Sequence, residues 1–495
     1  MADLLRARNI PEKPSPGAHK ECVYWGPKKS KPLDPTLIDG LLKEEWKDYR
    51  DRTLRSSIES TLAEQTTPLG VTSSFQHWDP YPLSIVSAKG AYVTDCDGRR
   101  LLDLSMGFGA ILAGHLNPTV VSEVKSALDD HGLLFVTPSP VSRQAAEIIC
   151  KRFNIDQVRF TNSGTEATMS AVRLARAISG KLGILKVEGG YHGGYDPLLV
   201  SYKPELKLAG PGYSPTAVAN VKGLVSGDVF VTAYNDLACL EKVLKVHHQT
   251  IACFIIEPVL QNIGLIVPDA GYLEGVRLLC DRYQIILIFD EVKTGLTAGN
   301  RGSLRLGVVP DLICLAKSIG GGVAVGAFGG KKKFMDGVTN GTYAHCGTFN
   351  GNPLAAAGIR AMDIVCTPAN LARAENLNYQ ALRRCQQIIQ KYELPAQISG
   401  FGVKGCVTWS VDRVRNYRDY MNIDFKVSEL HWLWMINRGI ITPPGLDEQW
   451  LVSLAHGQEE IDRLVENFKD FAKSVTGRKR VLLVPPNDSR RGCPC

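Results

Sequence analysis

The sequence lacks the features that mark membrane, zinc-binding and disulfide-rich proteins. Its 495 residues contain no run of about 18 apolar residues, the length that a membrane-spanning helix needs. The thirteen cysteines are odd in number and scattered, without a C-x-x-C pair or a zinc-ligand spacing. We therefore expect no membrane span, no disulfide framework and no bound metal, and we place the chain in a reducing compartment, the cytoplasm.

The chain also lacks a nucleotide-binding P-loop and any internal repeat. No G-x-x-x-x-G-K-[ST] motif occurs in the chain. The two acidic residues that end one apolar run, Asp290 and Glu291, are therefore not explained as part of an ATPase site. Most of the net charge of +7 lies in the basic tail 476–495. A basic chain end of this kind is usually solvated, and we expect neither nucleic acid nor a membrane as a partner.

The apolar pattern divides the rest of the chain. Residues 1–67 are a mostly polar N-terminal extension, and 68–110 contain a β-hairpin with its turn at Asp97-Gly98. Between 111 and 365, helical stretches alternate with short apolar runs, while 366–475 is mostly helical. The apolar runs lie at 158–160, 182–187, 251–259, 285–292 and 312–315. Alternation of this kind predicts an α/β fold with a mainly parallel sheet between helices.

Ligands of an open parallel sheet bind at the carboxyl ends of its strands, and one of these ends is followed by small polar residues. Ser163, Gly164 and Thr165 begin a helix directly after the run 158–160, and Ser163 and Glu166 fit a capping box. The free N–H groups of such a helix start bind anions. A plain capped helix explains the same residues.

Acidic and aromatic residues follow two other strands. Asp290 and Glu291 end an apolar strand and point to opposite faces, so one of them lies at a depth that requires a cationic partner. A structural ion pair is the alternative. Tyr191 and His192 stand among glycines, either in an ordinary turn or where a flat ligand lies against the backbone.

Lys317 is the one cation between the apolar run 312–315 and three glycines, Gly320–Gly322. A lysine in such surroundings is costly unless it is paired or reactive. Together with the anion site, the carboxylates and the aromatic residue, it describes a ligand with a phosphate, a ring with a protonatable nitrogen and an aldehyde. That ligand is pyridoxal 5'-phosphate, and Lys317 is its covalent partner.

Eight motifs follow one another in a specific order. They are "FTNSGTEA", "GGYHGG", "IIEPV", "FDEVKTG", "LAKSIGGG", "GAFGG", "GTFNGNPLAAAG" and "SLAHGQEEID". Over about 68–475 they resemble the class III pyridoxal-phosphate-dependent aminotransferases, in the branch of glutamate-1-semialdehyde aminomutase and the β-amino-acid aminotransferases. The resemblance implies fold type I, as in aspartate aminotransferase. It also implies a large cofactor domain (111–365), a smaller α/β domain from 68–110 and 366–475, and a homodimer with shared active sites.

The resemblance assigns roles to single residues. Lys317 matches the Schiff-base lysine, and Asp290 matches the carboxylate on the pyridine nitrogen. Tyr191 and Val292 match the residues on the two faces of the ring. The other cofactor-binding positions are Ser163, Gly164 and Thr165 at the phosphate, His192, Glu257 near the ring hydroxyl, and Thr348, which reaches the phosphate of the neighbouring subunit.

An arginine of the resembling enzymes is missing. Those that act on amino acids hold the substrate carboxylate with an arginine in the segment equivalent to 68–83, where this chain has Ser73 and Gln76. Glutamine does not replace the arginine fork, so we expect a substrate without a free carboxylate at its reacting end, such as an amine or an ester. His77, Trp78 and Tyr81 either line its pocket or belong to the core, and Arg143 and Arg301 are candidate replacement cations.

We therefore expect a transaminase that moves an amino group between a small amine or amino-acid donor and a keto or aldehyde acceptor. An aminomutase of the glutamate-1-semialdehyde type or a racemase would use the same lysine. A relative without catalysis would usually have lost Lys317 or Asp290, and both are present.

Overall fold

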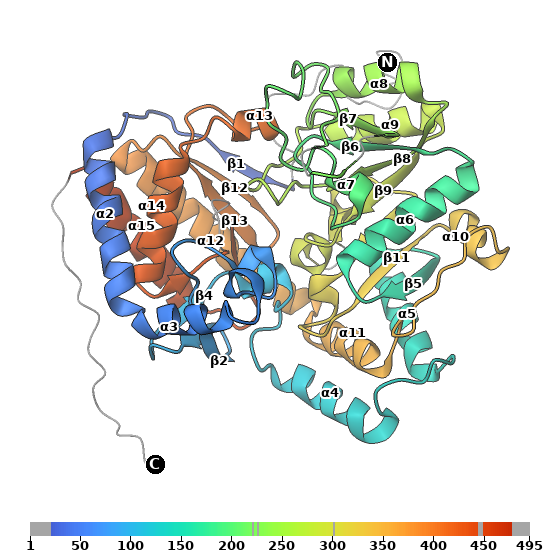
Figure 1. Ribbon diagram of the computed structural model, residues 1–495, viewed down its shortest axis with the longest axis horizontal. Coiled ribbons are helices and arrows are strands. Elements are labelled where there is room, and N and C mark those ends of the chain that lie inside the picture. The colour runs from blue at the N-terminus through green and yellow to red at the C-terminus, as the bar shows by residue number, and fades with distance from the viewer. Residues whose placement is uncertain (1–20, 220–221, 225–226, 300–301, 444–448, 478–495) are drawn as a thin grey trace.

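The computed structural model describes residues 21–219, 222–224, 227–299, 302–443 and 449–477, and it consists of two lobes (Figure 1). The large lobe, on the right in Figure 1, is built around one mainly parallel sheet. The second lobe, on the left, combines helices from both ends of the chain, drawn in blue and in orange to red. Most of the basic tail lies outside the described residues. The division of the chain at residues 67, 110, 365 and 475 stays a prediction.

The large sheet has the strand order β5-β11-β10-β9-β8-β6-β7. Neighbouring strands are parallel, except where β11 pairs with β5 and β10. The five apolar runs form β5, β6, β8, β9 and β10, as the sequence predicts. Strands β7 and β11 were not expected, and three of the five residues of β11 are glycines. The bounds are β5 (Gln157–Thr161), β6 (Gly183–Val187), β7 (Val229–Thr232), β8 (Ile251–Ile256), β9 (Ile286–Asp290), β10 (Leu312–Leu315) and β11 (Gly326–Gly330).

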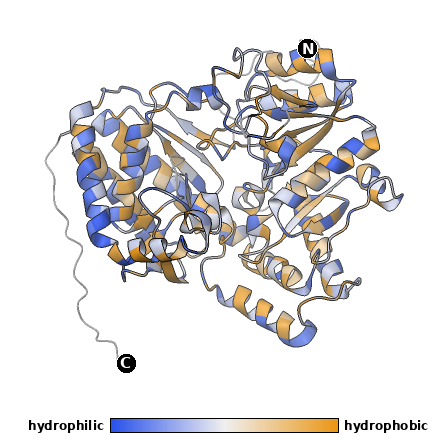
Figure 2. Cartoon of the chain, viewed as in Figure 1, coloured by the Kyte–Doolittle hydropathy of each residue, from blue (hydrophilic) through white to orange (hydrophobic). Residues whose placement is uncertain are grey.

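Helices cover both faces of this sheet. Helix α6 packs on β8, β10 and β11, while α8 and α9 pack together and contact β7 and β9. Strands β8, β9 and β10 are therefore buried along their whole length, and the large sheet is mostly orange in Figure 2. The helices of this lobe are α4 (Pro118–His131), α5 (Pro140–Phe153), α6 (Gly164–Ser179), α7 (Asp196–Leu199), α8 (Leu237–His247), α9 (Tyr272–Tyr283), α10 (Lys332–Thr339) and α11 (Pro353–Val365).

The second lobe contains two smaller sheets, ordered β1-β12-β13-β15 and β14-β4-β3-β2. The predicted hairpin is present as β3 and β4, and Gly98 in its turn has a φ of 83°, which suits glycine. The strands are β1 (Val23–Trp25), β2 (Ile85–Lys89), β3 (Tyr92–Asp95), β4 (Arg100–Asp103), β12 (Gln397–Phe401), β13 (Lys404–Thr408), β14 (Ile440–Ile441) and β15 (Gln449–Leu451). The helices are α2 (Pro35–Arg52), α3 (Leu54–Ala63), α12 (Pro368–Tyr392), α13 (Tyr417–Tyr420), α14 (Phe425–Asn437) and α15 (Gln458–Val475).

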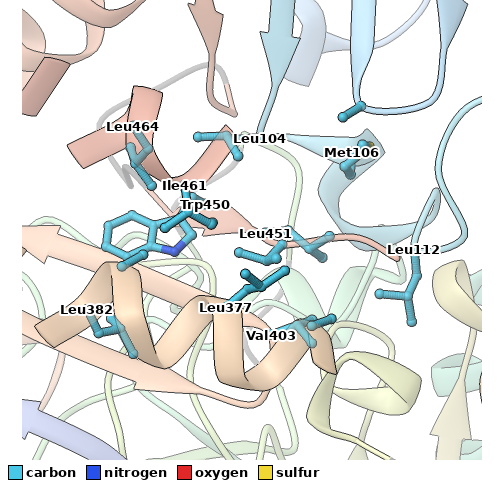
Figure 3. Packing of buried hydrophobic residues seen from close by; sticks show 14 of the residues in the cluster. Leu104, Met106, Leu112, Leu377, Leu382, Val403, Trp450, Leu451, Ile461 and Leu464 are labelled. Atoms are coloured by element: carbon cyan, nitrogen blue, oxygen red, sulfur yellow. The ribbon is translucent and has the colours of Figure 1, made fainter. Parts of the chain in front are cut away.

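The two chain ends share one apolar core. Helix α2 packs on α14, and α12 packs on α15. Figure 3 shows how Leu104 and Met106 from the N-terminal part meet Trp450 and Leu451 from the C-terminal part. This shared core holds the second lobe together although its elements are more than 300 residues apart in sequence. Within the described residues no helix is long and apolar enough to cross a membrane.

Candidate active site

Lys317 lies two residues after the end of the buried strand β10 and begins the short 3₁₀ helix Lys317–Ile319. Its φ of 49° lies in the left-handed region, which a lysine rarely adopts and which is often found at functional sites. Burial lowers the pKa of its amine to about 8; the charge of Lys293 adds to this shift, and the charges of Asp290 and Glu257 oppose it. Near neutral pH this amine is therefore poised to accept and to release a proton.

Asp290 ends the adjacent strand β9, where it lies opposite Cys314 in the parallel pairing with β10. Its Oδ1 accepts a hydrogen bond of 3.0 Å from the N–H of Val292, and its Oδ2 lies 2.8 Å from Nδ1 of His192. His192 is buried, and its Nε2 has no partner among the described residues. The histidine is the hydrogen-bond partner of this buried carboxylate.

Glu291 points away from Asp290, as the alternation along a strand predicts. Its carboxylate accepts hydrogen bonds from the N–H of Ser303, at 2.8 Å, and from the Ser303 hydroxyl. Burial raises the pKa of Glu291 to about 7, although these bonds act in the opposite direction. Glu291 therefore supports the structure behind the strand and does not face the cavity.

The start of α6, where the sequence predicts an anion site, is a capped helix start beside the cavity. Ser163 Oγ accepts the N–H of Glu166 at 3.2 Å, and the Glu166 carboxylate accepts the N–H of Asn162 at 2.6 Å. A Cβ at Gly164 would lie 2.8 Å from Val292, so only glycine lets the helix start approach so closely. Thr165 Oγ1 accepts the N–H of Gly194 at 3.1 Å, which ties the glycine-rich loop to the helix.

Lys186, on strand β6, holds the loop that carries Tyr191 and His192 through hydrogen bonds to backbone oxygens. The Lys186 amine is fully buried and donates to the carbonyl oxygens of Gly190, Leu198 and Val200 at 2.6–2.9 Å. Burial lowers the pKa of this amine to about 7. Three carbonyl acceptors match the three protons of an ammonium group, so Lys186 determines where the loop lies.

Glu257 follows β8 at the same edge of the sheet. Its carboxylate accepts hydrogen bonds from the backbone N–H of Tyr191 (3.4 Å), the backbone N–H of Gln261 (3.1 Å) and the side-chain amide of Asn262 (3.1 Å). Burial raises its pKa, and the charge of His192 is the first effect that opposes this. Glu257 thus connects the backbone at Tyr191 with the loop that contains Gln261 and Asn262.

These residues surround one cavity of about 350 Å³. It is lined by nine of the ten site residues expected from sequence: Ser163, Gly164, Thr165, Tyr191, His192, Glu257, Asp290, Val292 and Lys317. Thr348, the tenth, is exposed and lies in a separate surface hollow of about 470 Å³. A position outside the cavity of its own chain is what a contact to a neighbouring subunit would require.

Several residues of the cavity wall were not expected from the sequence. Lys293 follows Asp290 by three positions and could have been found by the same strand-end rule. Asn162 and Asn262 are polar residues in loops without a distinctive pattern. Phe75 comes from the segment 68–83 and packs edge-to-face on Tyr191, with ring centroids 5.6 Å apart.

The expected pocket aromatics are placed differently. Trp78 and Tyr81 pack with Tyr49 and Trp432 in the core of the second lobe, and Trp78 Nε1 donates to the Tyr49 hydroxyl at 3.1 Å. His77 does not line the cavity either. The reason is burial, because Trp78 and Tyr81 pack against aromatic residues of α2 and α14. Of the aromatic residues in the segment 68–83, only Phe75 lines the cavity.

No arginine lines the cavity within the described part of the chain. Gln76 turns back and accepts the hydroxyl of Thr72 at 2.9 Å. Arg143 is exposed and pairs with Glu147 on its own helix, and Arg301 lies outside the described residues. The missing arginine fork is therefore not replaced by any arginine that the structure places at this site.

The cavity fits pyridoxal 5'-phosphate group by group. The helix start at 163–165 suits a phosphate, and the carboxylate of Asp290 suits a protonated ring nitrogen. Tyr191 offers an aromatic face, and the Lys317 amine suits an aldehyde. Gly193 packs closely on Thr165 at this helix start, since a Cβ at Gly193 would lie 2.5 Å from Thr165 Oγ1.

Comparisons with known proteins point to the same chemistry. The family model described as aminotransferase class-III matches residues 74–423. A glutamate-1-semialdehyde 2,1-aminomutase of Thermomicrobium roseum is 39% identical over 414 residues, which are 82% of this chain and 94% of that protein. An omega-transaminase structure from Sphaerobacter thermophilus is 30% identical with a TM-score of 0.80, covering 85% of this chain and 97% of the other. A transaminase with PLP bound is 28% identical with a TM-score of 0.78, covering 86% and 98%.

Proposed function

Because the chain belongs to the class-III aminotransferase family, of fold type I and dependent on pyridoxal 5'-phosphate, we propose that Lys317 binds the cofactor aldehyde and Asp290 binds its ring nitrogen. The observation that carries this is the register of β9 and β10. Asp290 pairs with Cys314 on the adjacent parallel strand, and Cys314 lies three residues before Lys317. The side chains of Asp290 and Lys317 line the same cavity.

The other residues hold the cofactor in place. The backbone at Ser163, Gly164 and Thr165 binds its phosphate through free N–H groups at the positive end of α6. Tyr191 and Val292 cover the two faces of the ring, and His192 keeps the Asp290 carboxylate oriented. Glu257 lies toward the ring hydroxyl, held there by Asn262 and by two backbone N–H groups.

The reaction then follows from these side chains. When bound, the cofactor supplies a protonated aromatic ring that accepts electrons from the substrate carbon bearing the amine. Asp290, as a carboxylate, holds the proton on the ring nitrogen. The Lys317 amine takes the proton from the substrate carbon and returns it to the other reacting carbon, a role that suits its pKa of about 8. The result is amino transfer between a small amine or amino-acid donor and a keto or aldehyde acceptor.

Borohydride trapping tests the assignment of Lys317. The yellow holoenzyme should fix the cofactor on the peptide that contains Lys317. Lys317→Ala should fold and lose turnover by several orders of magnitude, since the covalent partner and the proton carrier are lost together. Lys47→Ala, at an exposed position of α2, is the matched control and should trap cofactor like the wild type. Cofactor fixed on another lysine would refute the proposal.

An aminomutase is the second candidate function, and the Thermomicrobium roseum relative is the observation in its favour. The two reactions differ in what one substrate alone does. A transaminase treated with an amine donor and no acceptor should convert its cofactor stoichiometrically to the amine form and recover the yellow form when a keto acid is added. An aminomutase or racemase would turn over its substrate many times without any added acceptor.

We also propose a homodimer with shared active sites, in which Thr348 of one chain serves the phosphate site of the other. The hollow that contains Thr348 adjoins exposed apolar residues, as an interface requires: Leu133, Phe135, Val136 and Phe349. The proposed location is the cytoplasm; the scattered cysteines, all free within the described residues, support a reducing compartment.

A further inference from the structure

Two lysines from different lobes meet beside the cofactor cavity. Lys293 follows β9 in the large lobe and lines the cavity, whereas Lys404 begins β13 in the second lobe and is buried. The Lys293 amine donates to the backbone oxygen of Gln261, and the Lys404 amine donates to Oε1 of the same glutamine at 2.7 Å. Lys404 also donates to the backbone oxygen of Lys293 at 3.0 Å, so it anchors the chain at that point.

Three lysine amines lie close enough in this corner of the cavity to influence one another. Burial lowers the pKa of Lys404 well below its usual value, and the charges of Lys293 and Lys317 lower it further, while Glu257 opposes them. Gln261 contributes a side-chain amide whose Nε2 is buried and has no partner among the described residues. An anionic group that entered beside Lys293 would meet two hydrogen-bond donors, the Lys293 amine and this amide.

The carboxylates on this side of the cavity already have partners. Asp290 is bonded to His192 and to the N–H of Val292. Glu257 accepts two backbone N–H groups and the amide of Asn262. These two carboxylates accept hydrogen bonds from loop residues and face the cofactor position. An additional anion beside Lys293 would therefore not compete with them for the same hydrogen-bond donors.

The wall next to Lys293 is aromatic. The Lys293 amine lies 5.9 Å from the ring centroid of Phe108, which packs edge-to-face on Phe75 with a centroid separation of 6.1 Å. Phe75 in turn packs on Tyr191, which covers the ring position of the cofactor. A ligand that lies along this wall would place an apolar body on the rings and its charged end at the amine.

We propose that Lys293 binds the carboxylate of an amino-acid or keto-acid substrate whose body is apolar or aromatic. Lys293 thus binds the substrate carboxylate in place of the arginine that is missing from the segment 68–83. Lys404 positions Lys293 through the hydrogen bond to its backbone oxygen. The inference rests on the proposed function, since the substrate must enter this cavity to react. It replaces the expectation that the substrate lacks a free carboxylate. That expectation considered only arginines, whereas a lysine lines the same cavity.

Binding of an unreactive acid tests this without turnover. Isothermal titration of the holoenzyme with 3-phenylpropanoate and with 3-phenylpropanamide compares one molecule with and without the negative charge. The wild type should bind the acid about tenfold to a hundredfold more tightly than the amide, the usual effect of one hydrogen-bonded charge pair. Lys293→Met and Lys293→Gln should remove the preference, Lys293→Arg should keep most of it, and Lys47→Met, on the surface of α2, should not change it.

The outcomes separate this inference from the proposed function. A wild type without any preference for the acid overturns it, whatever the variants do. A preference that persists in both neutral variants, with the cofactor absorbance and melting temperature of the wild type, overturns it as well. Borohydride trapping at Lys317 and the half-reaction with an amine donor would remain intact in both cases. Their failure would contradict the proposed function instead.

Discussion

Asp290 and Glu291 show how a single step along a strand separates two roles. Asp290 faces the cavity and is bonded to His192, whereas Glu291 faces the protein interior and is bonded to Ser303. Both carboxyl groups are buried. The difference between a site residue and a structural residue therefore lies in the face of the strand and in the neighbour, since both residues carry a buried carboxyl group.

Glu291 should make the stability of the protein depend on pH. Its pKa is about 7 in the folded chain against an ordinary value of 4.5, so between these pH values the folded state binds more protons than the unfolded state. The free energy of unfolding should fall as the pH rises from 4.5 to 7, by an amount on the order of 3 kcal/mol. Glu291→Gln should remove this contribution, and melting temperatures measured from pH 5 to 8 should then vary less.

The control for this measurement is Glu59→Gln, an exposed glutamate of α3. It should keep the pH dependence of the wild type. A Glu291→Gln variant whose melting temperature follows the same pH curve as the wild type would show that the carboxylate is not protonated in the folded state near neutral pH.

At the scale of elements, the site depends on glycine-rich turns that let backbone segments approach one another. The loop after β6 touches the start of α6 at Gly193 and Gly194. Gly193 has a φ of 91°, and a Cβ there would lie 2.5 Å from Thr165 Oγ1. At Gly194 a Cβ would have no heavy atom within 4 Å. The two neighbouring glycines therefore offer a test of the proposed phosphate site.

Gly193→Ala should weaken cofactor binding, because the added carbon pushes Thr165 and the helix start out of position and strains the backbone. Titration of the apoprotein with pyridoxal 5'-phosphate, followed by absorbance, should give an affinity at least about tenfold lower, as expected for the loss of one charge-assisted hydrogen bond. Gly194→Ala should bind like the wild type. Equal affinities for both variants would argue against a phosphate at this helix start.

For the whole molecule, the proposed homodimer leads to a prediction about mixed dimers. In the proposed homodimer each active site takes Thr348 from the other chain, so two different inactive subunits should complement each other. Lys317→Ala lacks the reactive amine, and Thr348→Glu places a negative charge where the partner's phosphate is bound. A hybrid of the two variants contains one site with a native Lys317 and a native Thr348.

Doubly tagged hybrid dimers, purified after co-expression, should recover turnover that neither parent dimer shows. Light scattering should give the mass of a dimer for the wild type and for both variants. An active monomer, or hybrids no more active than the Thr348→Glu parent, would contradict the shared site.

The sequence by itself determined which chemistry the protein carries. Lys317, Asp290, the 163–165 turn and the Tyr191 loop each stand where an apolar run ends, and such local patterns can be recognised without a structure. They predicted the mainly parallel sheet, and nine of the predicted residues lie around one cavity. Their order along the chain was specific enough to indicate the family.

The tertiary structure decided which of the remaining side chains reach the cavity. Strand β10 lies beside β9 through contacts that no local pattern encodes, and this brings Lys317 next to Asp290. Phe75 enters from the N-terminal segment while Trp78 is drawn into the core of the second lobe. Lys404 reaches Lys293 from the other lobe. The substrate end of the site is assembled from distant segments, whose side chains settle where burial and hydrogen bonding are best satisfied, and this depends on the whole fold.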